Sequence, residues 1–133
     1  MISVFADTSF YIALVNPGDE AHTAARTHAA GYRGQVVTTD FVLVELGNML
    51  SRVGDREVFV QLWNQLQSDP RTSIVPADRG LLSRAQDLFA SRLDKEWSLT
   101  DCASFVVMQE AVIREAFTTD HHFEQVGFIA LLK

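Results

Sequence analysis

The sequence predicts an α/β protein with a central parallel β-sheet that helices cover on both faces. Short apolar runs, partly β-branched, alternate along the chain with longer segments that carry apolar residues at helical spacing. Strands separated by helices pair in parallel, because a parallel neighbour is reached only through a crossover connection. The chain has 133 residues, 47% of them hydrophobic, so we expect one domain with one core over residues 1–133.

In the first half of the chain, each expected strand leads into helices. The run 2–6 is apolar and Asp7 ends it, which predicts a buried strand. Ser9 can cap the short helix that follows, and Asn16-Pro17-Gly18 stops that helix. The other elements expected in this half are helix 20–30, strand 35–38, and helices 40–53 and 55–66.

The second half has the clearest capping signals. Asp78 can cap the helix that follows strand 72–75. Ser98 opens the longest helix, and Asp101 three residues later gives nearly the pattern of a capping box. The other elements expected in this half are helices 78–89 and 98–115 and strands 116–119 and 127–132.

Several classes of protein are excluded by simple counts. The single cysteine, Cys102, has no partner for an internal disulfide and excludes a four-cysteine zinc site. No charge-free stretch approaches the roughly 18 residues of a transmembrane helix. The N-terminal residues lack the basic region of a signal peptide. We therefore expect a cytoplasmic protein that does not bind a membrane.

Four carboxylates stand where folding alone does not favour a charge. Asp7 and Asp120 each follow an apolar strand directly, and ligands of parallel α/β sheets bind at the carboxyl ends of strands. Glu45 interrupts an apolar helix, and Asp101 lies in the first turn of a helix whose next residues carry no charge. Each acid alone is also explained by a helix cap or an exposed edge.

The four acids together suggest metal chemistry. Clustered carboxylates repel one another unless a cation lies between them. Hard divalent ions such as Mg²⁺ and Mn²⁺ take oxygen ligands and act together with substrate phosphates. Because no cysteine or histidine accompanies the four acids as a predicted ligand, the pattern favours metal-assisted phosphoryl chemistry over zinc hydrolysis.

The same residues resemble the PIN-domain family, most closely its small VapC-type ribonuclease toxins, along essentially the whole chain. The motifs that carry the resemblance are Val4-Phe5-Ala6-Asp7-Thr8-Ser9, the segment from Thr38 to Leu46 that contains Glu45, Ser98-Leu99-Thr100-Asp101, and Thr118-Thr119-Asp120-His121-His122-Phe123. The resemblance implies a three-layer α/β/α fold around a central, mostly parallel five-stranded sheet. It also implies cleavage of RNA with Mg²⁺ or Mn²⁺ as cofactor.

Roles for individual residues follow from the resemblance. It implies a catalytic and metal-binding quartet that consists of Asp7, Glu45, Asp101 and Asp120. It implies Ser9 and Thr118 as supporting hydroxyls. The implied function is that of the toxin in a type II toxin–antitoxin pair, with RNA as substrate, a cognate antitoxin protein as partner, and a homodimer as the assembly.

Some alternatives stay open. Relatives often carry a basic side chain after the fourth acid, where this chain has His121 and His122, which can bind substrate, reach a metal or form a plain surface turn. A stand-alone PIN protein that binds or processes RNA without a toxin role is the alternative function, although a complete quartet argues against loss of activity. Receiver domains and haloacid-dehalogenase-like phosphatases also have an acid after the first strand, but the phosphatases need a second Asp where Ser9 stands, and both need a lysine late in the sheet.

The net charge of −6, taken alone, argues against a nucleic-acid partner, because attraction to phosphates favours a positive protein. Four of the acids belong to the proposed site, however, and removing four negative charges from −6 leaves −2 for the rest of the molecule. Bound divalent ions would cancel the charge of the quartet. We therefore expect weak non-specific RNA binding with a modest salt dependence, and substrate choice by shape.

Overall fold

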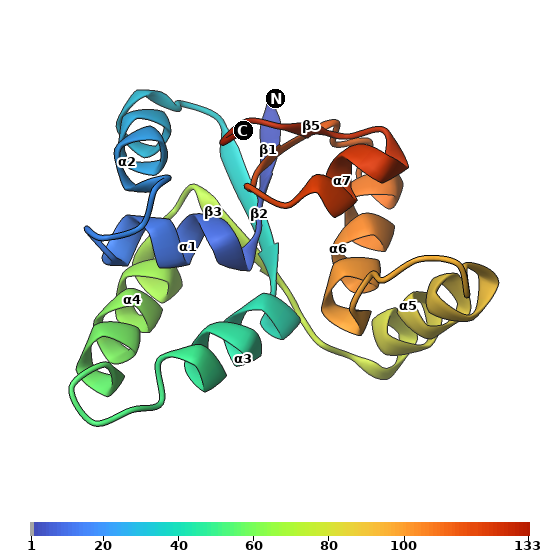
Figure 1. Cartoon of the computed structure of the whole chain (residues 1–133), viewed down its shortest axis with the longest axis horizontal. Coiled ribbons are helices and arrows are strands. Elements are labelled where there is room, and N and C mark those ends of the chain that lie inside the picture. The colour runs from blue at the N-terminus through green and yellow to red at the C-terminus, as the bar shows by residue number, and fades with distance from the viewer. Residues whose placement is uncertain (1) are drawn as a thin grey trace.

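Five strands form one sheet in the order β3-β2-β1-β4-β5, and the pairings between neighbours are all parallel (Figure 1). The structure is a computed structural model that describes residues 2–133. The strands are β1 (Ser3–Ala6), β2 (Gln35–Thr39), β3 (Thr72–Val75), β4 (Glu115–Phe117) and β5 (Ile129–Ala130). The prediction of a parallel five-stranded α/β sheet is confirmed.

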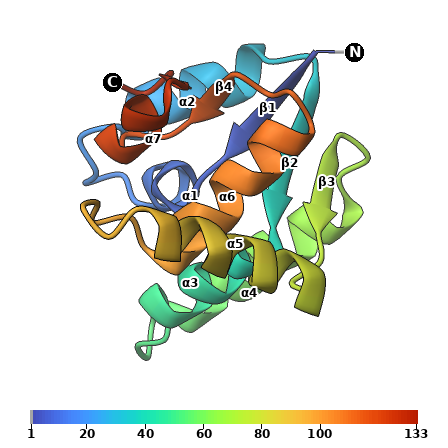
Figure 2. The same ribbon diagram turned by 90° about the vertical axis from the view of Figure 1, so that its right-hand side faces the viewer.

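Helices cover both faces of this sheet. They are α1 (Thr8–Val15), α2 (His22–Gly31), α3 (Asp40–Met49), α4 (Arg56–Ser68), α5 (Arg79–Ser91), α6 (Leu99–Glu110) and α7 (His121–Val126). Figure 1 shows α1, α2 and α4 on one side of the strands and α5, α6 and α7 on the other. The turned view in Figure 2 shows α5 lying across α6, with which it makes extensive contact. The architecture is therefore three-layered.

Aromatic side chains fill the core on both sides of the sheet. Phe105 of α6 packs edge-on against Phe123 of α7, with ring centroids 4.9 Å apart. On the other side, Phe10 of α1 stacks on Phe117 of β4 at 4.6 Å. All four rings are buried. Burial of such large apolar surfaces is the main force that holds the helix layers onto the sheet.

The capping signals at Ser98 and Asp78 are confirmed. The Ser98 side chain accepts the backbone N–H of Asp101, and the Asp101 carboxylate accepts the N–H of Ser98, which completes a capping box. Asp78 likewise accepts the N–H of Leu81 at 2.8 Å. These contacts satisfy backbone donors that the first turn of a helix leaves free. The cap expected at Ser9 is wrong, because α1 already begins at Thr8, and its N-cap residue Asp7 makes no side-chain capping hydrogen bond.

The C-terminal quarter differs from the prediction. The helix expected to reach residue 115 ends at Glu110, and the strand expected over 127–132 is reduced to Ile129–Ala130. An unexpected short helix, α7, occupies the segment after Asp120 and ends at Gly127, whose φ of +102° suits glycine. Within residues 2–133, no helix combines the length and apolar character needed to cross a bilayer.

Candidate active site

The four predicted acids line one cleft at the carboxyl ends of the strands. This cleft has a volume of about 540 Å³, and Asp7, Glu45, Asp101 and Asp120 all contribute to its wall. Asp7 and Asp120 are neighbours because β1 pairs with β4, in a register that places Ala6 opposite Phe117. Glu45 reaches the cleft from α3 and Asp101 from the first turn of α6. The fold thus gathers acids that are far apart in the sequence.

Asp7 is the most deeply buried of these acids, with 5% of its surface exposed. Its Oδ2 accepts hydrogen bonds from the hydroxyls of Thr118 at 2.8 Å and Ser9 at 3.1 Å. Burial raises the pKa of Asp7 to about 6, the Thr118 hydroxyl opposes this shift, and the negative charge of Asp101 adds to it. The carboxyl group is therefore held in one orientation but poorly compensated for its charge.

The two supporting hydroxyls connect the ends of β1 and β4. The hydroxyl oxygens of Ser9 and Thr118 lie 3.2 Å apart. Ser9 Oγ also accepts the backbone N–H of Thr119 at 3.1 Å, and Thr118 Oγ1 accepts that of Asp120 at 3.0 Å. These bonds fix the loop that carries Asp120, so the predicted supporting residues contact the acids that they were expected to serve.

Asp101 combines a structural and a site position. It closes the capping box of α6, yet it also lines the cleft and is 8% exposed. Burial raises its pKa, the backbone bond from Ser98 lowers it, and the charge of Asp120 raises it. Asp101 is therefore both the cap of α6 and a part of the cleft wall, and its role as a site acid stays a prediction.

Glu45 forms a separate part of the wall. It is half-buried on α3, where it lines the cleft together with Met49 of the same helix. Within residues 2–133, its carboxylate has no ion-pair partner within 4.0 Å. Its charge is thus open to the cleft.

Two further carboxylates in the cleft were missed by the sequence reasoning. Asp19 follows the turn Asn16-Pro17-Gly18, and Glu96 lies in the loop before α6, and both line the same cleft. Asp19 also accepts the backbone N–H of Ala21 at 2.8 Å, as an ordinary loop aspartate does. No local signal marks either residue, because only the tertiary fold brings these loops to the strand ends.

The histidines that the sequence left open lie beside Asp120. His122 lines the cleft, and its Nδ1 is 3.3 Å from Asp120 Oδ1 and 3.4 Å from Asp101 Oδ2. His121 Nδ1 is 3.7 Å from Asp120 Oδ1, and the His121 side chain is largely exposed. Asp120 itself begins α7 by accepting the backbone N–H of His122 at 2.9 Å.

The donor set fits a hard divalent cation. Carboxylates from the ends of two strands and from two helices face one open cleft. The negative charge of Asp101 raises the pKa of Asp7, and that of Asp120 raises the pKa of Asp101. A cation between these carboxylates would relieve the repulsion. Carboxylate oxygens are the ligands that Mg²⁺ and Mn²⁺ prefer.

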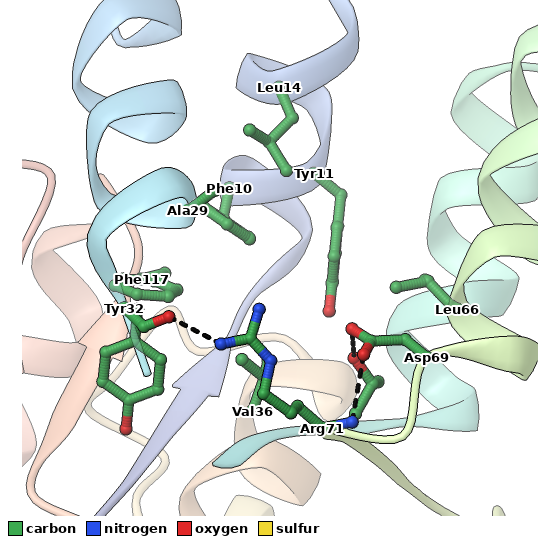
Figure 3. Close-up of a pocket in the computed structure, with 11 residues that line it drawn as sticks. Phe10, Tyr11, Leu14, Ala29, Tyr32, Val36, Leu66, Asp69, Arg71 and Phe117 are labelled. Carbon is green, nitrogen blue, oxygen red and sulfur yellow. Dashed lines mark hydrogen bonds between the residues drawn. The ribbon is translucent and has the colours of Figure 1, made fainter. Parts of the chain in front are cut away.

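A second cavity, of about 130 Å³, lies away from the acids (Figure 3). Its wall is mainly apolar and aromatic, with Tyr11, Tyr32 and Leu66 among the lining residues. Its carboxylate, Asp69, accepts the backbone N–H of Arg71 at 3.0 Å and the hydroxyl of Thr72 at 2.8 Å. This cavity lacks the concentration of charge that marks the cleft.

Comparison with known proteins identifies the family of this chain. The family model described as "PIN domain" matches residues 4–129. The "23S rRNA-specific endonuclease VapC20" of two Mycobacterium tuberculosis strains is 33% identical over 127 residues, which is 95% of each chain. The crystal structure of M. tuberculosis VapC20, described as a sarcin-ricin loop cleaving toxin, superposes with a TM-score of 0.86 at 28% identity and covers 95% of this chain and 96% of that one. The chain belongs to the PIN-domain family.

Proposed function

We propose that this protein is a divalent-metal-dependent endoribonuclease and the toxin of a type II toxin–antitoxin pair. The observation that carries the proposal is the meeting of Asp7, Glu45, Asp101 and Asp120 in one open cleft. A relative named as an endonuclease shares the fold along 95% of the chain, which supports the same reaction class. The partners in this proposal are a cognate antitoxin and a second copy of the chain, and its compartment is the cytoplasm.

In this proposal two of the acids bind the metal ion directly, and the other two act on water or contact the ion through water. Asp7 and Asp101 are the direct metal ligands, because they are the most buried and the least compensated. A Mg²⁺ or Mn²⁺ ion there would neutralise charge on the scissile phosphate and lower the pKa of a water. Glu45 and Asp120, at the wall of the cleft, orient the attacking water or contact the ion through water.

Ser9 and Thr118 have a positioning role. Both donate to Oδ2 of Asp7, so they leave Oδ1 without a hydroxyl partner and fix the plane of the carboxylate. Thr118 Oγ1 also receives the backbone N–H of Asp120 at 3.0 Å. One hydroxyl therefore holds two of the acids at a constant separation, as a reaction that depends on orientation requires.

We infer the substrate class from the relative. VapC20 is named for 23S rRNA, and its crystal structure is described by cleavage of the sarcin-ricin loop. The same loop is our proposed substrate for this chain. A near-neutral exterior outside the site supports recognition by RNA shape more than by a strong charge attraction.

The test uses the tag-free protein and two short RNA hairpins, one with the sarcin-ricin loop sequence and one with that loop scrambled. We expect one cut in the first hairpin with Mg²⁺ or Mn²⁺, no cut with EDTA, and no cut by an Asp101→Asn variant. Undiminished cleavage in EDTA would overturn the metal role. Binding of the hairpin by wild-type protein without cleavage would favour the stand-alone RNA-binding function.

The toxin role needs a separate measurement in cells. We expect induced expression of the wild-type chain to arrest growth, and expression of Asp101→Asn at the same level to leave growth unchanged. Immunoblots with equal signals provide the control for expression. Normal growth with an enzyme that cleaves RNA in vitro would contradict the toxin role while leaving the ribonuclease activity intact.

A further inference from the structure

We propose that Asp120, His121 and His122 form a second cation site in the cleft, which binds a borderline divalent ion of the Zn²⁺, Ni²⁺ and Co²⁺ class. Among residues 2–133, these three side chains are a group whose potential ligand atoms all lie within 4.8 Å of one another. The site adjoins the all-oxygen position at Asp7 and Asp101. The inference concerns the cleft of the proposed function but does not depend on RNA cleavage.

The present distances are close to those of a bound ion. Two atoms that share one ion at bonds of about 2.1 Å lie about 3.4 Å apart at a tetrahedral angle. Asp120 Oδ1 is 3.3 Å from His122 Nδ1 and 3.7 Å from His121 Nδ1. The two imidazole rings have centroids only 4.4 Å apart. Small side-chain rotations are therefore enough to bring the three donors onto one ion.

An unpartnered nitrogen points to the same site. His122 Nδ1 is buried and makes no hydrogen bond to residues 2–133, although two carboxylate oxygens lie near it. A buried polar atom without a partner is costly, and in native proteins it usually has a function or a missing ligand. An ion bound by Nδ1 would satisfy this atom.

The loop is rigid enough to hold such a site. The backbone N–H of Asp120 is fixed by Thr118 Oγ1 at 3.0 Å, and that of His122 by Asp120 Oδ1 at 2.9 Å. His122 keeps 19% of its side chain exposed and His121 keeps 62%, so an ion can enter from the cleft and retain an open coordination position. Three protein ligands with one open position are a common arrangement for Zn²⁺.

The two imidazoles decide the class of ion. Imidazole nitrogen suits Zn²⁺, Ni²⁺ and related ions, whereas Mg²⁺ requires oxygen ligands and keeps several waters. The sequence predicts the four acids alone as ligands and leaves open whether His121 and His122 reach a metal. In the structure, the start of α7 places both rings beside the Asp120 carboxylate.

The test measures ion binding by calorimetry on tag-free protein, because a histidine tag binds the same ions. The variants are His121→Ala and, as the matched control on a different helix, His28→Gln of α2. We expect the wild type and His28→Gln to bind one Zn²⁺ with the same affinity. Loss of one ligand should weaken Zn²⁺ binding in His121→Ala by at least about tenfold, with Mg²⁺ affinity changed by less than about twofold.

Further variants locate the ion. Asp7→Asn should keep the Zn²⁺ affinity, and Co²⁺ should give the wild type a visible absorption spectrum that His121→Ala lacks. Zn²⁺ binding that is equal in His121→Ala and wild type would overturn the proposal. So would Zn²⁺ binding that Asp7→Asn abolishes and His121→Ala keeps. The His122→Gln variant tests a second ligand and should also weaken Zn²⁺ binding. If His122→Gln does not fold, the result for His121→Ala decides, because the His121 side chain is exposed.

The proposed second cation site and the proposed ribonuclease function can fail independently of each other. RNA cleavage in Mg²⁺ is a different measurement, so a wild-type protein that binds Zn²⁺ through His121 but cleaves no RNA would support the second site and contradict the nuclease. An active nuclease whose Zn²⁺ binding ignores His121 would do the reverse.

Discussion

Asp7 and Asp69 are carboxylates beside the same sheet, and their surroundings shift their pKa values in opposite directions. Asp69, at the apolar cavity of Figure 3, accepts the backbone N–H of Arg71 and the hydroxyl of Thr72, and these bonds lower its pKa. Asp7, in the cleft, is buried near Asp101, and its pKa rises to about 6 despite two hydroxyl donors. The donors of Asp69 come from its own turn, whereas one of the donors of Asp7 is Thr118, which follows β4 and is far away in the sequence.

This difference is the one we expect between an acid that stabilises a turn and an acid of the proposed site. The charge of Asp69 is satisfied locally, so this residue can stabilise its turn without any ligand. Asp7 lies with other carboxylates in an open cleft, where its charge is compensated only in part. A group that is destabilised by its surroundings in this way is a candidate for binding a cation.

The largest effect should appear in catalysis. Asp7→Asn removes a proposed ligand and is expected to lower the initial rate of sarcin-ricin hairpin cleavage by at least about 100-fold. Asp69→Asn is the matched control and should keep the rate within about twofold, because Asp69 lies outside the cleft. Initial rates in Mg²⁺ check both. Full activity of Asp7→Asn would contradict the proposal that Asp7, unlike Asp69, is a metal ligand.

The next effect concerns stability in the absence of divalent ions. Because the fold raises the pKa of Asp7 to about 6, it favours the neutral carboxyl group. This contribution to stability is complete below the ordinary pKa of 3.8 and is lost as the pH rises through about 6. Asparagine stays neutral, so the free energy of unfolding of Asp7→Asn should exceed that of the wild type by up to about 3 kcal/mol at pH 8.

Urea unfolding in EDTA at pH 4.5 and pH 8 measures this gain. The difference between Asp7→Asn and wild type should be small at the lower pH and large at the higher one. An equal difference at both values would mean that the carboxyl group does not titrate in this range.

How much of this comparison the sequence could predict depends on how local each signal is. Asp7 and Asp120 follow apolar strands, and Asp101 completes a capping box. The residues next to each of these acids therefore make it recognisable in the sequence. Asp19 and Glu96 lie in loops, and nothing local distinguishes them from ordinary surface acids. Their place in the cleft depends on the path of the whole chain.

The missed helix α7 has a similar cause. Its six residues are too few to show helical periodicity. Its beginning at Asp120 and its end at Gly127 are each visible in the sequence, but Asp120 also fits a strand end. This helix places two histidines beside Asp120, and these three residues form the proposed second cation site.

A smaller effect is expected at Asp69. Asp69→Ala removes the acceptors of two hydrogen bonds and should cost about 1–2 kcal/mol at pH 7. Its lowered pKa means that the contribution is present above pH 3.8 and is lost as the pH falls through the lower pKa of the folded state. The difference in unfolding free energy between the wild type and Asp69→Ala, measured with urea, should therefore be largest at pH 7 and shrink as the pH falls below 3.8. A stability difference of the same size at acidic pH would mean that it comes from lost packing and not from the charge of Asp69.

The smallest effect links the two acids through metal binding. Mg²⁺ at about five times its Kd should stabilise the wild type by about 1 kcal/mol, which raises Tm by about 3 °C. Asp69→Ala should show the same rise from its lower starting Tm, and Asp7→Asn should show almost none. The rise should also shrink below pH 6, because protons compete with the ion for the Asp7 carboxylate. Differential scanning calorimetry of the three proteins with and without Mg²⁺ measures it, and an equal rise in Asp7→Asn would place the ion elsewhere.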